Sequence, residues 1–437
     1  MPKGGAVLVG LIGAGNVGAE VARTLISRAD EYARRLGRPV LISRIVVRDA
    51  ARPRTGIDPE LISTDVSTVL DDPAIDIVVD LTAGEQPALE YISRALSAGK
   101  YVVTVNKEVM AKHGQSFLAL ARQHNSDILF EGSVGGGIPI IAPLKRDLLG
   151  NRITAVSAII NGTTNYILTA MSREGADFGE ALRQAQELGY AEPDPTNDVE
   201  GEDARYKLAI LASLAFRTPV RVEDIYREGI TKLTARDFRY AAELGYTIKL
   251  LALARRQDGG IQTRVHPTLL PADAPLAKVD GVLNAVQVEG DLVGRVNFQG
   301  RGAGPAPTTS AAVADVLDAA RSIISGGVGA HGNAPSLQPE EEPARIVPMS
   351  ELITRYYIRL TVADKPGVLA QIATKLGDAQ ISISSVIQKE THVAAQTAEL
   401  VIMTHEAREA SIQGALAEVE RLDVVQAIGN FLRVEEQ

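Results

Sequence analysis

The 437-residue sequence predicts an α/β protein with three parts: a doubly wound parallel sheet, a mixed α+β region and a small C-terminal βαββαβ unit. Short apolar runs alternate with helical patterns at the start of the chain, which is typical of a parallel sheet. A second group of strand-like runs and helices follows up to residue 325. After a stretch rich in glycine, proline and acid, a new pattern of four strands and two helices begins.

The first part of the chain predicts a Rossmann-type doubly wound sheet. Five short apolar runs end in turn-forming or polar residues, which is the pattern of buried parallel strands. These strands are expected at 6–12, 45–47, 75–79, 101–105 and 128–130. Helices are expected at 17–36 and 88–97. We place this domain at residues 1–131, and we expect the segment at about 300–325, with a helix at 309–325, to return to it.

The rest of the chain predicts two further domains. A glycine-rich turn at 132–139 opens an α+β domain that we place at 132–325. Its expected strands are 153–160, 250–254, 262–265 and 282–288, and its expected helices are 140–149, 178–188, 201–215 and 234–244. Residues 326–350 are expected to form a linker. The βαββαβ order over 351–437 predicts a ferredoxin-like domain.

The composition excludes several classes of function. The sequence has no cysteine, so disulfides, thiolate metal ligands and a cysteine nucleophile are excluded, which fits a reducing cytoplasm. A net charge of −9 argues against a general nucleic-acid-binding protein, which needs a basic face. No run of about 18 or more apolar residues predicts a membrane span. We therefore expect a cytoplasmic protein without nucleic-acid or membrane partners.

A glycine-rich turn directly follows the first expected strand. Gly13 permits a tight turn, Gly15 lets the backbone approach a pyrophosphate, and Gly18 lets helix and strand pack closely. The helix that follows presents free N–H groups and the positive end of its dipole to an anion. A similar turn in another kind of α/β protein is the alternative. The predicted cofactor turn consists of Gly13, Ala14, Gly15, Asn16, Val17 and Gly18.

Charged residues at the end of the second expected strand bear on the choice of cofactor. An acid at this position would bind the ribose 2′-hydroxyl of NAD, whereas an arginine would pair with the 2′-phosphate of NADP. Here Arg48 and Asp49 are adjacent, and Arg52 and Arg54 follow. The arginines favour NADP, with NAD as the second candidate. The alternative is that they belong to a solvated loop.

Two lysines are candidates for acid–base chemistry. Lys107 follows the fourth expected strand, and ligands of doubly wound sheets bind at the carboxyl ends of strands; an exposed loop lysine is the alternative. Asp203 and Lys207 are four residues apart on an expected helix, so they form either a surface pair or a partly buried one, as the apolar residues that follow suggest. Burial would lower the pKa of Lys207 and suit it to donate a proton to a developing alkoxide.

An acidic stretch precedes Lys207. Six acidic residues lie between Glu192 and Asp203. Their spacing alone leaves three interpretations open: a solvated charge run, a divalent metal site, or a pocket for a substrate ammonium group.

Several motifs taken together resemble those of the homoserine dehydrogenase family. These motifs are GAGNVG at 13–18, TVNK at 104–107, SVGGGIPI at 133–140, NGTTNY at 161–166, LGYAEPDP at 188–195 and DVEG at 198–201. The resemblance covers residues 6 to about 325, and the tail from about 353 resembles an ACT regulatory domain. Because no aspartate kinase pattern is seen, we expect the monofunctional form.

The resemblance implies reversible reduction of L-aspartate 4-semialdehyde to L-homoserine with NAD(P)H, in threonine, methionine and isoleucine biosynthesis. Lys207 would be the acid–base residue, Asp203 would bind and position the substrate and support proton transfer, and Lys107 would help to hold substrate and cofactor. Glu192 would bind the substrate amino group, and Asp198 would shape the pocket. Further contacts are assigned to Gly189 for the substrate and to Thr82 and Gly304 for the cofactor. A monovalent cation, expected to be Na⁺, would be held largely by backbone oxygens of Glu131, Val134, Gly136 and Ile138.

The resemblance also implies regulation and assembly. The turn after residue 363 matches the first turn of ACT domains, where the loop commonly helps to bind an amino acid at a domain interface. Threonine is the implied inhibitor, and an ACT unit that only dimerises is the alternative. A homodimer or homotetramer is expected, with the middle domain serving for substrate binding and dimerisation. The expected effector contacts are Asp364, Pro366, Gly367 and Val368.

Three other functions compete with this interpretation. Aspartate-semialdehyde dehydrogenase needs a cysteine nucleophile, which this sequence lacks. Phosphoglycerate dehydrogenase also has an ACT tail, but it would place the glycine turn in mid-chain and use a histidine–acid pair. A non-catalytic amino-acid sensor would keep the ACT tail without needing Lys107 and Lys207.

Overall fold

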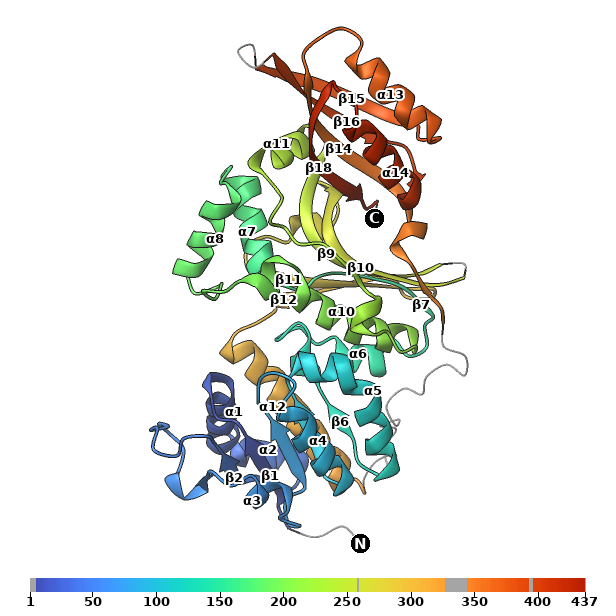
Figure 1. The fold of residues 1–437 in the computed structure, drawn as a ribbon. Helices are drawn as coiled ribbons and strands as arrows, with labels where there is room; N and C mark the ends of the chain where they lie inside the picture. The colour runs from blue at the N-terminus through green and yellow to red at the C-terminus, as the bar shows by residue number, and fades with distance from the viewer. Residues whose placement is uncertain (1–4, 258, 327–343, 393–395, 437) are drawn as a thin grey trace. The chain divides into compact units, whose positions relative to one another are not determined.

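The computed structural model describes residues 5–257, 259–326, 344–392 and 396–436, and the chain divides into two compact units (Figure 1). Unit 1 comprises residues 1–156, 206–222 and 285–344. Unit 2 comprises residues 157–205, 223–284 and 345–437. None of the helices in the described parts of the chain is long and apolar enough to cross a membrane.

Unit 1 contains a six-stranded parallel sheet with the strand order β3-β2-β1-β4-β5-β6. Its strands are β1 (Val7–Ile12), β2 (Val40–Val46), β3 (Ile62–Ser63), β4 (Ile77–Asp80), β5 (Tyr101–Thr104) and β6 (Ile128–Leu129). This order is that of the doubly wound dinucleotide-binding fold, so the prediction of a Rossmann-type sheet is confirmed. In this fold, ligands bind at the carboxyl ends of strands where the order reverses, here β1 and β4.

The helices of unit 1 cover this sheet. They are α1 (Asn16–Ser27), α2 (Ala29–Leu36), α3 (Ser67–Leu70), α4 (Ala88–Ser97), α5 (Lys107–Gln123), α6 (Ile141–Lys145) and α12 (Pro305–Ile324). The expected helix at 17–36 is two helices, because Arg28 leaves helical geometry at φ −109° and ψ 16°. Helix α12 starts four residues earlier than expected, with Pro305 at its first position, where the missing N–H of proline costs nothing.

Helix α12 returns from late in the sequence to the core of this sheet. It packs against α1 (Figure 1), and its alanine-rich face is buried in the same core as β1 and β4. Ala312, Val316 and Ala320 are fully buried there. Small side chains allow a close approach of the helix, so α12 shares the core of this sheet.

Unit 2 contains a second sheet, which runs from the middle of the chain into its C-terminal region. Within this unit the order is β9-β10-β18-β14-β16-β15. The strands are β9 (Tyr246–Gln257), β10 (Gly260–Pro271), β14 (Ile353–Ala363), β15 (Ile383–His392), β16 (Thr397–Thr404) and β18 (Val425–Val434). β9 and β10 are antiparallel, and β10 pairs with β18 in parallel. The C-terminal sheet therefore continues the sheet of the middle region.

The last four of these strands, with α13 (Val368–Asp378) and α14 (Glu409–Glu420), have the βαββαβ order of the predicted ferredoxin-like domain. This domain has its own core, built by apolar residues such as Tyr356, Ile372, Leu400 and Leu416.

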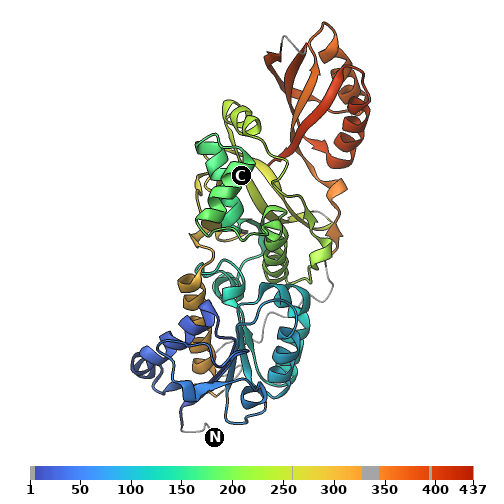
Figure 2. The same cartoon turned by 60° about the vertical axis from the view of Figure 1, so that its left-hand side comes forward.

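The remaining helices are α7 (Gly162–Arg173), α8 (Phe178–Glu187), α9 (Thr196–Val199), α10 (Glu202–Phe216) and α11 (Ala235–Glu243). Helices α7 and α8 pack side by side (Figure 2).

Several strands belong neither to the parallel sheet of unit 1 nor to the six strands given for unit 2. Three of them extend the second sheet beyond β9 in the order β12-β11-β7: β7 (Ile153–Ile159), β11 (Leu283–Gly290) and β12 (Gly294–Arg301). Strand β12 is not among the strands expected from the sequence. The short strands are β8 (Tyr226–Arg227), β13 (Ile346–Val347) and β17 (Ala407–Arg408). The boundary between the units falls within β7, α10 and β11. The predicted domain limits differ from these units and stay predictions, and most of the predicted linker, 327–343, lies outside the described residues.

A buried ionic cluster joins the C-terminal sheet to α11. The guanidinium of Arg359 contacts Asp237 at 2.7 Å and Glu399 at 3.2 Å, and all three side chains are almost fully buried. The hydroxyl of Tyr240 donates to Glu399 at 2.9 Å. Because these charges satisfy each other, the C-terminal βαββαβ domain has a defined attachment to the middle region of unit 2.

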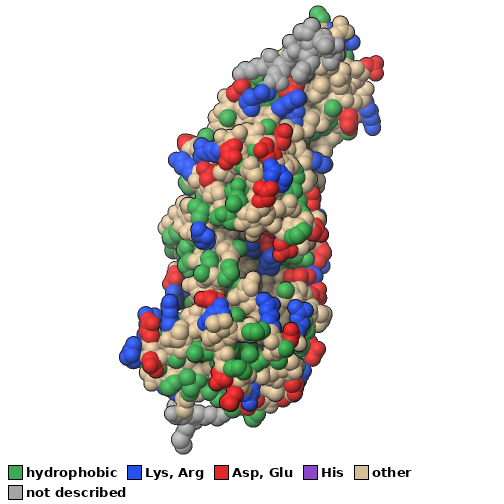
Figure 3. Space-filling view, turned by 90° about the vertical axis from the view of Figure 1, so that its left-hand side faces the viewer, with side chains coloured by type: hydrophobic (Ala, Val, Ile, Leu, Met, Phe, Trp, Pro, Cys, Tyr) green, Lys and Arg blue, Asp and Glu red, His purple; other side chains and the backbone are tan. Residues whose placement is uncertain are grey.

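Charged side chains are mixed on the molecular surface. On the face shown in Figure 3, basic and acidic residues alternate within each part of the chain without a continuous basic area. This agrees with the net charge of −9. A protein that binds nucleic acid generally concentrates Lys and Arg on one face.

Candidate active site

The glycine turn between β1 and α1 has the geometry that the sequence predicts. Gly13 has φ +97°, and a Cβ there would lie 2.9 Å from the peptide oxygen of Leu81. A Cβ at Gly18 would lie 2.1 Å from the peptide oxygen of Gly13, so only glycine fits. Nothing lies within 4 Å of a Cβ built at Gly15, and no side chain caps α1 in its first turn. The N–H of Gly13 is bonded to the peptide oxygen of Val46 at 2.9 Å, so the features of the turn that suit a phosphate are the open space beside Gly15 and the uncapped start of α1.

The four charged residues after β2 have different roles. Arg48, Asp49 and Arg52 are exposed, whereas Arg54 is half-buried. The Arg54 guanidinium donates to the peptide oxygens of Asp49 at 3.1 Å and Arg52 at 2.8 Å. It also reaches the peptide oxygen of Ala14 at 3.4 Å. Arg54 therefore ties this loop to the glycine turn, and Arg48 lies exposed at the end of the strand.

A polar cluster joins the carboxyl ends of β4 and β5. The hydroxyl of Thr82 donates to the buried carboxylate of Asp80 at 2.6 Å, and the hydroxyl of Thr104 donates to its other oxygen at 3.1 Å. The side chain of Asn106 donates to the peptide oxygens of Thr82 at 3.2 Å and Gly84 at 2.6 Å. Burial raises the pKa of Asp80 to about 6, although the hydroxyl donors oppose this shift. The cluster holds the loop after β4 against the start of α5.

Lys107 is the first residue of α5. Asn106 caps this helix, because its side-chain oxygen accepts from the N–H of Val109 at 3.2 Å. The cap fixes where the helix begins, and Lys107 is half-buried at the strand end where ligands of this fold bind. Lys112, further along α5, is paired with Glu85 and Glu108.

The glycine loop after β6 is organised by Glu131. Its carboxylate accepts from the backbone N–H groups of Ile140 at 2.5 Å, Ile141 at 2.8 Å and Ala142 at 2.7 Å. Gly136 has φ +52°, and a Cβ there would lie 2.5 Å from the peptide oxygen of Gly302. The loop therefore packs against the segment that leads to Gly304, which precedes α12 at φ +116°.

This arrangement limits the predicted cation site. The carboxylate of Glu131 already accepts three backbone N–H groups, so the peptide oxygens of Glu131, Val134, Gly136 and Ile138 stay the main predicted ligands of a cation. Among the residues the structure describes, no group of three or more His, Cys, Asp or Glu side chains is arranged to hold a metal ion.

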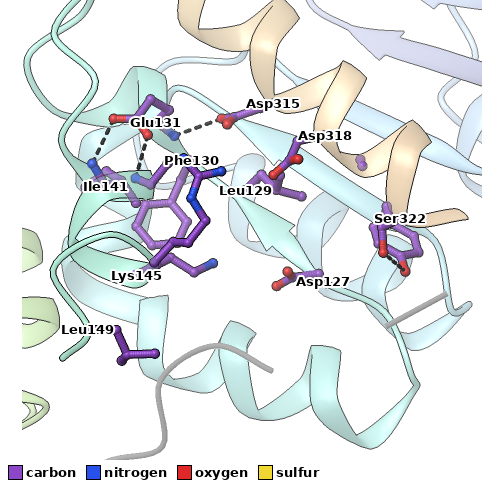
Figure 4. A pocket seen from close by; sticks show the side chains of 14 residues that line it. Asp127, Leu129, Phe130, Glu131, Ile141, Lys145, Leu149, Asp315, Asp318 and Ser322 are labelled. Carbon is purple, nitrogen blue, oxygen red and sulfur yellow. Dashed lines mark hydrogen bonds between the residues drawn. The ribbon is translucent and has the colours of Figure 1, made fainter. Parts of the chain in front are cut away.

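A small cavity of about 140 Å³ lies behind this loop, between β6, α6 and α12 (Figure 4). Asp315 accepts from the backbone N–H of Glu131 at 2.8 Å. Burial and the nearby Glu131 raise the pKa of Asp315 well above its usual range. Lys145 and Phe130 close one side, with the ammonium 5.7 Å from the ring centroid. The residues that line this cavity therefore hold the Glu131 loop in place.

The candidate substrate residues in unit 2 gather around Asn161, which follows β7 and caps α7. Its side-chain nitrogen donates to Asp198 at 2.6 Å and to Asp203 at 2.9 Å. Asp198 belongs to the short helix α9, and Asp203 is buried in the first turn of α10. The structure thus brings these two predicted acids together. The sequence motif contains Asn161, but we assigned it no role.

The other two predicted substrate residues lie in the loop between α8 and α9. Gly189 has φ +73°, which glycine adopts without strain, and Glu192 is exposed. The loop is attached to the helices beside it, because Gln186 donates to the peptide oxygen of Glu192 at 3.1 Å and Thr163 donates to that of Tyr190 at 2.7 Å. It is therefore a defined loop with an exposed carboxylate.

Asp203 and Lys207 lie one turn apart on α10, and their exposure decides between the two interpretations of this pair. Asp203 is 4% exposed and Lys207 is 8% exposed. A surface pair would leave both side chains in water. Both side chains are therefore buried, and buried charged groups are common in active sites.

The expected effector turn precedes α13. Gly367 has φ +87° at the start of the helix, and no side chain caps the first turn. Asp364 and Pro366 are exposed, and Val368 is buried in the core of the domain. The turn is thus accessible.

Models of three families match the chain. "Homoserine dehydrogenase, NAD binding domain" matches residues 13–131, "Homoserine dehydrogenase" matches 139–317, and "ACT domain" matches 356–424. Curated homoserine dehydrogenases from Neisseria gonorrhoeae and Synechocystis are 42% and 43% identical to this chain. Each alignment covers 98% of this chain and 98% or 99% of the relative.

Solved structures of homoserine dehydrogenases are also similar to this chain. A homoserine dehydrogenase from Thiobacillus denitrificans has a TM-score of 0.92 and 43% identity, over 99% of this chain and 98% of that one. A hyperthermophilic archaeal homoserine dehydrogenase in complex with NADPH has a TM-score of 0.62 and 29% identity, over 72% of this chain and 97% of that one. With a nicotinamide cofactor domain, a catalytic domain and an ACT domain in the same order, this chain belongs to the homoserine dehydrogenase family.

Proposed function

We propose that this enzyme interconverts L-homoserine and L-aspartate 4-semialdehyde with NADP as its preferred cofactor. The observation that carries this proposal is the burial of both Asp203 and Lys207, one turn apart on α10, in a chain that matches the family over 98% of its length. Burial disfavours the charged form of a lysine, and a lysine that exchanges its proton near neutral pH is suited to general acid–base catalysis.

The residues of unit 1 fit a dinucleotide. The uncapped start of α1 and the open space at Gly15 suit a pyrophosphate. Arg48 is exposed at the position where a 2′-phosphate would lie, and a solved archaeal relative contains NADPH. Thr82, Lys107 and Gly304 are assigned to the same cofactor. When bound, the nicotinamide would accept or supply the hydride.

Lys207 is assigned the proton transfer at the substrate oxygen. As negative charge develops on that oxygen during reduction, a cationic lysine stabilises it and donates the proton. In the direction of oxidation the same amine, uncharged, accepts the hydroxyl proton. Asp203 supports this exchange from one turn away, and Lys107 orients the reacting group. Glu192, Gly189 and Asp198 are assigned to binding the substrate, with the Glu192 carboxylate facing its ammonium group.

Two further assignments extend this proposal. Peptide oxygens of Glu131, Val134, Gly136 and Ile138 would hold Na⁺, because oxygen ligands suit a hard cation. Threonine would bind at the turn of Asp364, Pro366, Gly367 and Val368 and inhibit the enzyme. The enzyme would act as a homodimer or homotetramer.

A spectrophotometric assay tests these assignments. Homoserine-dependent reduction of NADP, faster than that of NAD, is the expected result. Threonine is expected to lower the rate of the wild-type enzyme and to have less effect on Asp364→Ala. Unchanged rates at millimolar threonine would contradict the effector assignment alone, whereas absent turnover in folded protein would contradict the whole proposal.

A further inference from the structure

Asn161 has contacts that its role as a helix cap does not require. It follows β7, is 5% exposed, and donates from a single amide nitrogen to Asp198 at 2.6 Å and Asp203 at 2.9 Å. The contact to Asp198 is short for an N–H···O hydrogen bond, and the contact to Asp203 has an ordinary length. Two carboxylates from two helices therefore meet at one neutral donor group.

The orientation of this amide follows from its neighbours. The side-chain oxygen of Asn161 accepts from the backbone N–H of Thr164 at 2.8 Å and from its hydroxyl at 2.9 Å. On the other side, ionised carboxylates can only accept hydrogen bonds, so the NH₂ group must face them. Thr164 is almost fully buried and holds the amide in this orientation.

We propose that Asn161 is a positioning residue that holds Asp198 and Asp203 at a fixed separation and keeps both ionised for the substrate. This inference rests on the proposed function, in which both acids serve homoserine. Asn161 itself has no assigned contact with the reacting atoms.

Electrostatics explains why an amide is needed here. Two carboxylates within hydrogen-bond distance of one nitrogen repel each other, and a neighbouring like charge disfavours the ionised form of a carboxyl group. Hydrogen bonds to the charged form oppose that tendency. A neutral amide supplies two donors without adding a charge that would compete for the carboxylates with a substrate ammonium group or with Lys207.

Asn161→Asp separates this role from helix capping. Aspartate caps helices about as well as asparagine does, so α7 keeps its cap. The two donors, however, are replaced by acceptors, which places a third carboxylate beside Asp198 and Asp203. We expect kcat/KM for homoserine to fall about 10- to 100-fold, through both KM and kcat. The acidic limb of the pH–rate profile should move to higher pH, because one carboxyl group of the cluster now titrates later.

Asn165→Asp is the matched control on the same helix. Asn165 donates to the peptide oxygens of Val279, Gly281 and Leu283, at 3.0 to 3.1 Å, and contacts neither acid. This variant should lower the thermal unfolding midpoint without moving the acidic limb. If Asn161→Asp does not fold, Asn161→Ser retains a cap and one short donor, and it should change the profile in the same direction by less.

The experiment measures kcat, KM for homoserine, KM for NADP and the pH–rate profile of the wild-type enzyme and these variants. Wild-type turnover decides the proposed function independently of the variants. The inference is supported if Asn161→Asp moves the acidic limb and raises KM for homoserine while KM for NADP stays within about twofold. It is overturned if folded Asn161→Asp or Asn161→Ser keeps the wild-type profile and KM, or if Asn165→Asp moves the profile equally.

Discussion

Asn106 in unit 1 and Asn161 in unit 2 occupy the same local position with different partners. Each lies two residues after a buried strand, is about 5% exposed and caps the helix that follows. Asn106 donates to two peptide oxygens, those of Thr82 and Gly84, whereas Asn161 donates to two carboxylates. The same residue type thus fixes a backbone loop in one unit and the positions of two carboxylates in the other.

The largest effect on the rate of the reaction is expected from Lys207, which is buried on α10 one turn after Asp203. Lys207→Met should lower kcat about 10²- to 10⁴-fold, because a general acid–base group is lost. Cofactor affinity should be retained, which equilibrium fluorescence titration with NADPH would show. Lys375→Met, on α13 in the ACT domain, is the control and should retain the wild-type kcat. Retained turnover in folded Lys207→Met would remove the acid–base assignment.

Asp80 gives the clearest pH dependence of stability in the Asn106 cluster. Burial raises its folded pKa to about 6 from an ordinary value of 3.8, so the folded state binds the proton more tightly than the unfolded state. The free energy of unfolding should therefore fall as pH rises from about 4 to 6, by up to about 3 kcal/mol from this group.

Unfolding midpoints of the wild-type protein and Asp80→Asn at pH 4 and pH 7 test this prediction. The stability of the wild type relative to the variant should be greater at pH 4 than at pH 7, since the variant lacks the titrating group. A difference that does not change with pH would mean that Asp80 titrates as an exposed acid.

Asn106→Asp should affect the cofactor rather than the substrate. Aspartate keeps the cap of α5 but cannot donate to the peptide oxygens of Thr82 and Gly84, so the loop after β4 loosens. We expect KM for NADP to rise about 10-fold, with the acidic limb of the pH–rate profile unchanged. The reverse pattern is expected for Asn161→Asp. Identical profiles for the two variants would break the comparison between the units.

The smallest expected effect concerns cofactor choice. Arg48→Ala should lower the ratio of kcat/KM for NADP to that for NAD roughly 3- to 10-fold, because an exposed charge–phosphate contact is weaker than a buried one. Arg44→Ala, on the same strand with its guanidinium bonded to the peptide oxygen of Glu60 at 2.8 Å, is the control and should leave the ratio unchanged. An unchanged ratio in Arg48→Ala would remove the argument for NADP.

Sequence patterns predicted what depends on local chemistry. The turn of Gly13, Gly15 and Gly18 was predictable because each position needs glycine for its own steric reason. The burial of Lys207 followed from the apolar residues around it on α10. The βαββαβ order of the C-terminal domain followed from its alternating strands and helices.

Contacts between distant segments were not predictable in the same way. Glu131 uses its carboxylate on three backbone N–H groups about ten residues away, which no spacing rule indicates. Asn161 stands in a recognisable cap position, but its two acidic partners lie 37 and 42 residues further along the chain. The break at Arg28 is set by a local change of backbone angles inside an otherwise helical pattern.

The most direct test of the account is homoserine oxidation by the purified wild-type enzyme beside Lys207→Met, with NADP and with NAD as separate cofactors. We predict homoserine-dependent reduction by the wild type, faster with NADP, and loss of turnover in the variant with NADPH binding retained. A folded wild-type protein that binds NADPH but does not turn over homoserine with either cofactor would contradict the central claim.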